Sequence, residues 1–190
     1  LTSRKANWSK SLGVDCLPLE VLHRNNSIAL LLRHRPDLDS AIAQLGELAH
    51  ELGDLPLALH LAGRYLARYR HSPLGQLGNY LLEIKKPELL SHRSMTEGDI
   101  SPTSHEQHVA RTFAISYGAL KSSSEIDQQA RDLLALATCF ASGEPLPLAF
   151  LSASYGLQSG ETDAMAKFED ALSRLTDLGL ISEADSGVLI

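Results

Sequence analysis

Apolar residues recur at helical spacing through the first half of the chain, and Gly and Pro separate the periodic segments. Helices are predicted over residues 27–35, 37–52, 55–69 and 74–84. Pro36 would end the first of them. Gly53 would follow the second in a left-handed conformation, and Pro56 would occupy the first turn of the third. Four short helices with tight connections predict a four-helix bundle over residues 21–91.

The second half begins after a polar segment, residues 92–105, which we interpret as a linker between two modules. Further helices are predicted over residues 104–120, 125–140, 145–151 and 163–178. Their inward positions are expected to be Val109, Phe113, Tyr117 and Leu120, then Ile126, Ala130, Leu133, Leu134, Ala137 and Phe140, and finally Met165, Phe168, Leu172 and Leu175. Residues 179–182 and 188–190 flank a turn and predict a β-hairpin.

Three helices followed by a hairpin predict a winged helix-turn-helix module over residues 106–190. The expected fold class is therefore mainly α, with a four-helix bundle followed by this module. Residues 1–20 lack helical periodicity, and we interpret them as a strand end and a connecting loop. The chain starts at Leu1 and ends in the apolar run 188–190, so both ends are expected to be cut from a longer polypeptide.

Composition supports a helical core and argues against two classes of partner. Of 190 residues, 44 % are apolar and only 5 % aromatic, so Leu and Ala must build most of the core. The formal net charge of −6 gives no general attraction to nucleic acid or to an anionic membrane. The longest apolar run, residues 28–32, is far too short to span a bilayer. We expect a cytoplasmic protein without nucleic-acid or membrane partners.

Residues with chemical potential are scattered. Cys16 and Cys139 lie far apart among apolar residues, and both are expected to be buried, reduced thiols. His105 and His108 are expected to be solvated rather than metal ligands, and the Glu169–Asp170 pair should lie on a solvated helix face. No Gly is followed by Lys, which excludes a phosphate-binding P-loop in this chain. We predict no catalytic residues and no metal site.

Several short segments stand out, and their order along the chain is informative. Thr2-Ser3-Arg4 comes first, and Gly53-Asp54-Leu55-Pro56-Leu57-Ala58-Leu59 follows. Ser116-Tyr117-Gly118-Ala119-Leu120 comes next, and the Leu-rich segment over 172–181 closes the series. In this order the segments resemble the NB-ARC (AP-ATPase) group of the STAND signal-transducing NTPases. Asp54 departs from the commoner Gly or Gln of that group, and the group's histidine motif would lie just beyond Ile190.

The resemblance implies a role for each motif. Arg4 would sense the terminal phosphate of a nucleotide, since a guanidinium makes forked, charge-assisted bonds to phosphate oxygens. Pro56, with Leu57 beside it, would pack against adenine at a helix start that has free N–H groups. Residues 1–20 would end the nucleotide-binding core, and the 92–105 linker would let the second module swing.

The resemblance therefore predicts the regulatory lid and hinge of an ADP/ATP switch ATPase in signal transduction. The fragment itself would not be an enzyme. ATP or ADP with Mg²⁺ would serve the whole protein and would not bind this fragment tightly. The implied partners are the protein's own upstream P-loop domain and a downstream sensor domain, which could contain repeats. The activated full-length protein could oligomerise.

Two alternatives remain open on the sequence. One is a DNA-binding winged-helix regulator, although residues 161–190 hold two basic and seven acidic side chains, 2 − 7 = −5. The other is a helical adaptor that binds partner proteins without any nucleotide. The effector domain, the triggering ligand and the oligomeric state are not encoded in these residues.

Overall fold

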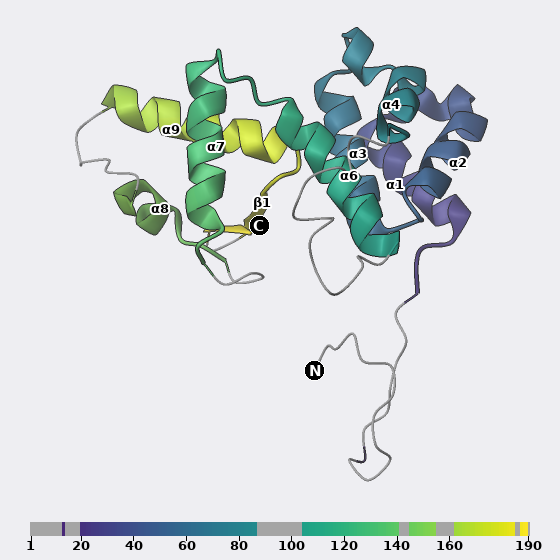
Figure 1. The fold of residues 1–190 in the computed structure, drawn as a ribbon, viewed down its shortest axis with the longest axis horizontal. Coiled ribbons are helices and arrows are strands. Elements are labelled where there is room, and N and C mark those ends of the chain that lie inside the picture. Colours follow the sequence, from purple (N-terminus) through teal and green to yellow (C-terminus); the bar gives the residue numbers. More distant parts are fainter. Residues whose placement is uncertain are drawn as a thin grey trace.

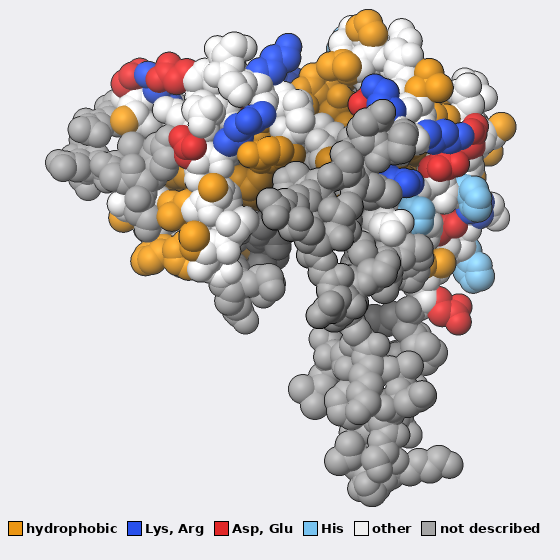
Figure 2. All heavy atoms as spheres, viewed as in Figure 1, with side chains coloured by type: hydrophobic (Ala, Val, Ile, Leu, Met, Phe, Trp, Pro, Cys, Tyr) orange, Lys and Arg blue, Asp and Glu red, His pale blue; other side chains and the backbone are white. Residues whose placement is uncertain are grey.

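The computed structural model describes residue 13 and residues 20–86, 104–140, 145–154, 162–184 and 187–189. These residues form a mainly helical molecule with one small hairpin, which confirms the predicted helical class (Figure 1). No helix in the described ranges is long and apolar enough to cross a membrane. Figure 2 shows basic and acidic side chains next to one another on the visible face. The elements, in chain order, are α1 (Arg24–His34), η2 (Pro36–Ala41), α2 (Ile42–Glu51), α3 (Pro56–Arg68), η3 (Pro73–Gly75), α4 (Leu77–Ile84), α6 (Ser104–Gly118), α7 (Glu125–Ala137), α8 (Leu148–Ser154), α9 (Thr162–Asp177), β1 (Ser182–Ala184) and β2 (Gly187–Leu189).

The N-terminal unit comprises α1 to α4 together with α6, and α3 lies at its centre. Helix α3 packs against α1 on one side and α6 on another, while α2 packs against α1 and α4. The core is built mainly from leucines that are almost completely buried, as the Leu- and Ala-rich composition predicts. These are Leu31, Leu45, Leu48, Leu52, Leu59 and Leu66.

One arginine is part of this core. Arg35 is only 5 % exposed and lies between α1 and η2. Its Nη1 donates to the carbonyl oxygens of Leu66 (2.8 Å) and Gly75 (3.0 Å). Its Nε and Nη2 form a forked pair with the Asp37 carboxylate at 2.9 and 2.8 Å. Arg35 thereby ties the end of α3, η3 and η2 together.

Helix α6 lies against the N-terminal unit, where it contacts α3 and α4. The sequence had placed this helix in the second module, after a linker over 92–105. In the structure the helix already begins at Ser104, and residues 92–103 lie outside the described ranges. The face that α6 buries is formed by Thr112, Ile115 and Ser116, so small side chains allow it to approach α3 closely.

This packing corrects the predicted inward face of α6. Phe113 and Tyr117 were expected in the core, but both are more than a third exposed, and their rings stack with centroids 6.1 Å apart. The buried stripe is rotated toward Thr112 and Ser116. Hydrophobic periodicity favoured the aromatic residues because it cannot anticipate that a helix will pack through its small side chains.

The C-terminal unit comprises α7, α8, α9 and the hairpin. Helices α7 and α9 form the main packed pair, and α8 contacts α7. Strands β1 and β2 pair antiparallel, with Glu183 opposite Val188. Leu146, between α7 and α8, pairs with Val188 through two backbone hydrogen bonds of 2.8 and 2.9 Å. The chain order is thus helix, bridging residue, helix, helix and hairpin.

Other inward assignments need correction as well. Ile126 and Met165 are more than a third exposed, and each lies in the first turn of its helix, where a helix has packing neighbours on fewer sides. Cys139 is an exposed free thiol rather than a buried one, because α7 ends at Ala137 and Cys139 lies in the turn that follows. Cys16 lies outside the described residues.

Candidate functional site

The turn between α2 and α3 carries the motif that the sequence singled out. Gly53 and Asp54 both adopt positive φ angles, 63° and 54°, as the expected left-handed helix end requires. The backbone N–H of Asp54 donates to the carbonyl oxygen of Ala49 at 2.9 Å, which closes the end of α2. Asp is one of the few non-glycine residues that tolerates this conformation.

Asp54 also fixes the chain that leads into α1. Its carboxylate accepts a hydrogen bond from Arg24 at 2.7 Å, and Arg24 donates in addition to the carbonyl oxygen of Gly46. The backbone N–H of Leu22 donates to the carbonyl oxygen of Asp54 at 3.0 Å. The commoner Gly or Gln would lack this charged partner for Arg24, so the Asp at position 54 has a structural role here.

Pro56 is the first residue of α3, as predicted, and Leu55 before it is extended. Pro56 and Leu57 are exposed, and Leu57 keeps 56 % of its surface accessible, whereas Ala58 and Leu59 are fully buried. Leu55 has no side-chain acceptor for the first N–H groups of the helix. The result is a small exposed apolar surface, formed by Pro56 and Leu57, beside an uncapped helix start.

A histidine from α6 lies against this turn. A Cβ added to Gly53 would come 2.8 Å from Cδ2 of His108, so only glycine fits between the turn and α6. His108 is partly buried and its Nδ1 has no hydrogen-bond partner, which corrects the expectation that it is solvated. The polar sequence before α6 suggested an exposed ring, and the packing of α6 on α3 buries it. The side chain of His105 lies outside the described ones.

The structure describes two of the three predicted site residues. Pro56 and Leu57 are adjacent on one surface, whereas Arg4 lies outside the described residues. Within the described ranges, no group of three or more His, Cys, Asp or Glu side chains could hold a metal ion. Glu169 and Asp170 are exposed, as predicted.

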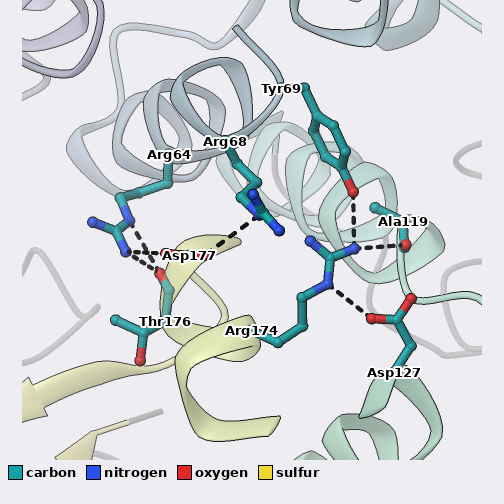
Figure 3. A network of polar contacts seen from close by, with 8 residues as sticks. All are labelled: Arg64, Arg68, Tyr69, Ala119, Asp127, Arg174, Thr176 and Asp177. Carbon is teal, nitrogen blue, oxygen red and sulfur yellow. Dashed lines mark hydrogen bonds and ion pairs between the residues drawn. The ribbon is translucent and has the colours of Figure 1, made fainter. Parts of the chain in front are cut away.

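The junction between the two units holds a second polar site, which the sequence did not reveal (Figure 3). Arg64 of α3 donates from Nε (3.0 Å) and Nη2 (2.5 Å) to the carbonyl oxygen of Thr176, at the end of α9. Arg64 and Arg68 both pair with the Asp177 carboxylate, at 3.8 and 3.3 Å. Two arginines of one unit therefore hold the C-terminal end of a helix of the other.

Arg174 is the central residue of this junction. Its Nε donates to the Asp127 carboxylate of α7 at 2.8 Å. Its Nη2 donates to the hydroxyl of Tyr69 at 2.9 Å and to the carbonyl oxygen of Ala119 at 3.1 Å. The Arg174 and Asp127 side chains are only 12 % and 10 % exposed, which strengthens the pair relative to a surface salt bridge.

The same contacts set the charge state of Asp127. Burial favours a higher pKa, but hydrogen bonds from the Lys121 N–H and from Arg174 outweigh it and lower the pKa of Asp127. One sequence signal for this residue was available, because Ser124 and Asp127 form an S-x-x-D capping pattern at the start of α7. The Ser124 hydroxyl indeed accepts a hydrogen bond from the backbone N–H of Asp127.

In comparisons with known proteins, no family model, no curated protein and no solved structure matched this chain. The resemblance to the NB-ARC group therefore rests on the order of its motifs along the sequence.

Proposed function

We propose that this chain is the regulatory lid and hinge region of an ADP/ATP switch ATPase of the NB-ARC type. In this proposal the N-terminal unit is the helical module that covers the nucleotide, and the C-terminal unit is a winged-helix module. ATP or ADP with Mg²⁺ would be held mainly by an upstream P-loop domain. The chain itself would not hydrolyse nucleotide, because the lysine and metal ligands of phosphoryl transfer belong to that domain.

The observation that carries the proposal is the exposed apolar surface of Pro56 and Leu57. The exposed side chains of Pro56 and Leu57 contribute little buried apolar surface, whereas Ala58 and Leu59 directly after them are fully buried. A flat apolar surface beside free helix N–H groups suits a nucleobase, which offers an apolar face and hydrogen-bond acceptors at its edge. Pro56 and Leu57 would contact adenine, and Arg4 would read the terminal phosphate.

The order of elements in the C-terminal unit supports the winged-helix assignment. Three helices precede the hairpin, and Leu146 pairs with Val188 of β2 as a third strand would. The charges on its surface oppose DNA binding. Helix α9, which would be the recognition helix, exposes Asp163, Glu169 and Asp170, and acidic side chains repel phosphates.

The test uses the full-length polypeptide that the proposal requires, with a P-loop domain upstream of Leu1. Its sequence must contain G-x-x-x-x-G-K-[ST], because a chain without that motif could not hold the phosphates as proposed. In that polypeptide, Pro56→Ala should accelerate ADP release, and Arg4→Ala should reduce the preference for ATP over ADP. Pro73→Ala is the matched control, since Pro73 is an exposed proline at the start of η3. ADP release unchanged by Pro56→Ala would contradict the adenine contact.

The isolated chain gives a second test. We expect no ATP hydrolysis and at best millimolar affinity, because the phosphate-binding groups are absent from these residues. Isothermal calorimetry with ATP and Mg²⁺ measures this directly. Binding of ATP in the micromolar range by residues 1–190 alone would show that the nucleotide site lies within this chain, and the proposal would be wrong.

A further inference from the structure

The segment that joins the two units, residues 119–124, is held by charged side chains at three successive positions. Arg174 donates to the carbonyl oxygen of Ala119, and Arg131 donates to that of Leu120. The N–H of Lys121 donates to the Asp127 carboxylate at 2.9 Å. All three charged side chains belong to the C-terminal unit. We call residues 119–124 the connector.

Arg174 forms a hydrogen bond with the N-terminal unit, whereas Arg131 lies over the Tyr117 ring of α6, with its guanidinium carbon 5.0 Å from the ring centroid. Arg174 bonds the connector and Asp127 within its own unit, and it also bonds the hydroxyl of Tyr69, just beyond α3, in the N-terminal unit (Figure 3). One guanidinium therefore fixes both the path of the connector and the position of one unit against the other. Its planar group with five donors can serve several acceptors at once.

Further polar contacts cross the junction. Arg64 and Arg68 hold Thr176 and Asp177 at the end of α9. An apolar contact lies at Gly179, where an added Cβ would lie 3.3 Å from the stem of Arg64 and 3.4 Å from Leu61. Interfaces of this polar character between units of one chain permit relative motion once their specific bonds are released.

The position of α6 determines where such motion can occur. Because α6 packs on α3 and α4, a swing about residues 92–103 would have to strip Ile115 and Thr112 from the N-terminal unit. A swing about the connector leaves α6 in place and separates α9 from α3, which touch less extensively than α6 and α3 do and are joined by the polar contacts described above. The connector is therefore the less costly place for the two units to move apart.

We propose that the connector is the hinge between the two units and that the hydrogen bonds of Arg174 hold the units in one orientation. Loss of the Arg174 contacts frees the C-terminal unit to reorient while both units stay folded. The proposal concerns the geometry of this chain alone and needs no nucleotide, so it can fail or succeed independently of the proposed ATPase role.

The experiment measures spin-label distances by pulsed electron paramagnetic resonance. One label is placed on native Cys139, which is exposed at the end of α7, and the other on Gly78→Cys in α4, where an added Cβ meets no atom within 4 Å. Cys16→Ser removes the other thiol. With Arg174 intact, the distances between the two labels should form one narrow distribution. In Arg174→Gln this distribution should become broad.

Two variants make the outcome decisive. Arg64→Gln removes a junction contact that the N-terminal unit supplies and leaves the connector unchanged. This variant should also broaden the distribution of distances between the two labels. Lys85→Gln removes a charge that pairs only within the N-terminal unit, with Glu47 and Glu51, and should leave the distance narrow. Circular dichroism shows whether each variant keeps its helices. If Arg174→Gln loses its helices, the Arg64→Gln variant provides the test instead. A narrow distance between labels 78 and 139 in Arg64→Gln would then overturn the proposal.

A second label pair locates the hinge. Gly118→Cys, at the end of α6, also has open space for a side chain. With Cys139→Ser and Cys16→Ser, the Gly78–Gly118 distance should stay narrow in Arg174→Gln, because α6 remains on the N-terminal unit. If this distance broadens together with the Gly78–Cys139 distance, α6 moves with the C-terminal unit and the hinge is not the connector. A narrow Gly78–Cys139 distance in Arg174→Gln would equally contradict the proposal that Arg174 holds the two units in one orientation.

Discussion

The inside of the N-terminal unit and its junction with the C-terminal unit are held together by different forces. Within the unit, leucines such as Leu45, Leu48 and Leu59 are completely buried around α3. At the junction, arginines bond carbonyl oxygens and carboxylates (Figure 3). Burial is non-directional and provides most of the folding free energy, whereas hydrogen bonds depend on distance and angle. The core therefore supplies stability, and the junction specifies orientation.

The largest effect is expected inside the core. Leu59→Ala should lower the free energy of unfolding by about 3 kcal/mol, because it removes buried methyl groups and leaves a cavity beside the N-terminal part of α3. Urea denaturation followed by circular dichroism measures the loss. Leu82→Ala is the control, since Leu82 is 70 % exposed on α4 and its truncation should change stability by less than ~0.5 kcal/mol. Equal losses in both variants would contradict the core described here.

The next effect tests whether a charge can behave as part of the core. Arg35→Gln should cost about 2 kcal/mol, because the carbonyl oxygens of Leu66 and Gly75 lose their buried donor. Arg33→Gln, two residues earlier and exposed, should cost much less. Thermal unfolding of the two variants gives the comparison. If Arg35→Gln loses no more stability than Arg33→Gln, then water replaces the Arg35 guanidinium as a hydrogen-bond donor without loss of stability.

A pH effect should distinguish the two regions. Burial lowers the pKa of His34, whose ring lies 5.1 Å from that of His60, and His60, Arg64 and Arg33 lower it further. Burial and Arg64 also lower the pKa of His60. The unfolded chain then binds more protons than the folded one below the ordinary histidine pKa of ~6.5. Stability should therefore be complete above this pH and fall as the pH drops below it.

Urea midpoints measured between pH 8 and pH 5 test this expectation. The double variant His34→Gln, His60→Gln should show a shallower dependence, whereas His71→Gln, at an exposed site, should retain the slope of the parent chain. A double variant with an unchanged slope would place the acid sensitivity elsewhere. The Arg174–Asp127 pair should persist over the whole range, because the pKa of Asp127 is lowered and its stabilisation is lost only at more acidic pH.

The smallest effect is expected at the exposed start of α3. Pro56→Ala should change the free energy of unfolding by at most ~1 kcal/mol, since Pro56 is exposed and the preference of proline for a first helical position is what is lost. Differential scanning calorimetry of the isolated chain measures it. A loss as large as that of Leu59→Ala would show that Pro56 is a structural residue rather than a surface for a ligand.

Local structure could be predicted from the sequence to within a few residues at most helix ends. Periodicity located the described helices, and Gly53 and Pro56 marked the turn between α2 and α3 with its correct conformation. These signals work because a helix and its ends are determined by neighbours a few positions away. The start of α2 was less accurate, because residues 36–41 form a separate 3₁₀ turn.

Tertiary contacts could not be predicted in the same way. The partners of Arg174 lie 47, 55 and 105 positions away, and no local pattern relates them. The packing of α6 through Thr112 and Ser116 was missed because small polar residues do not contribute to a hydrophobic stripe. The exposed candidate residues Pro56 and Leu57 were identified through resemblance, and their exposure is information that only the structure supplies.

The close approach of His108 to Gly53 links two distant places in the molecule. Helix α6 continues from His108 to Gly118, a rigid rod of about 15 Å at the usual helical rise, and the connector follows directly. The near end of α6 touches the turn beside Pro56, and its far end leads into the segment that Arg174 bonds. One helix therefore spans the whole distance between the exposed start of α3 and the junction of the two units.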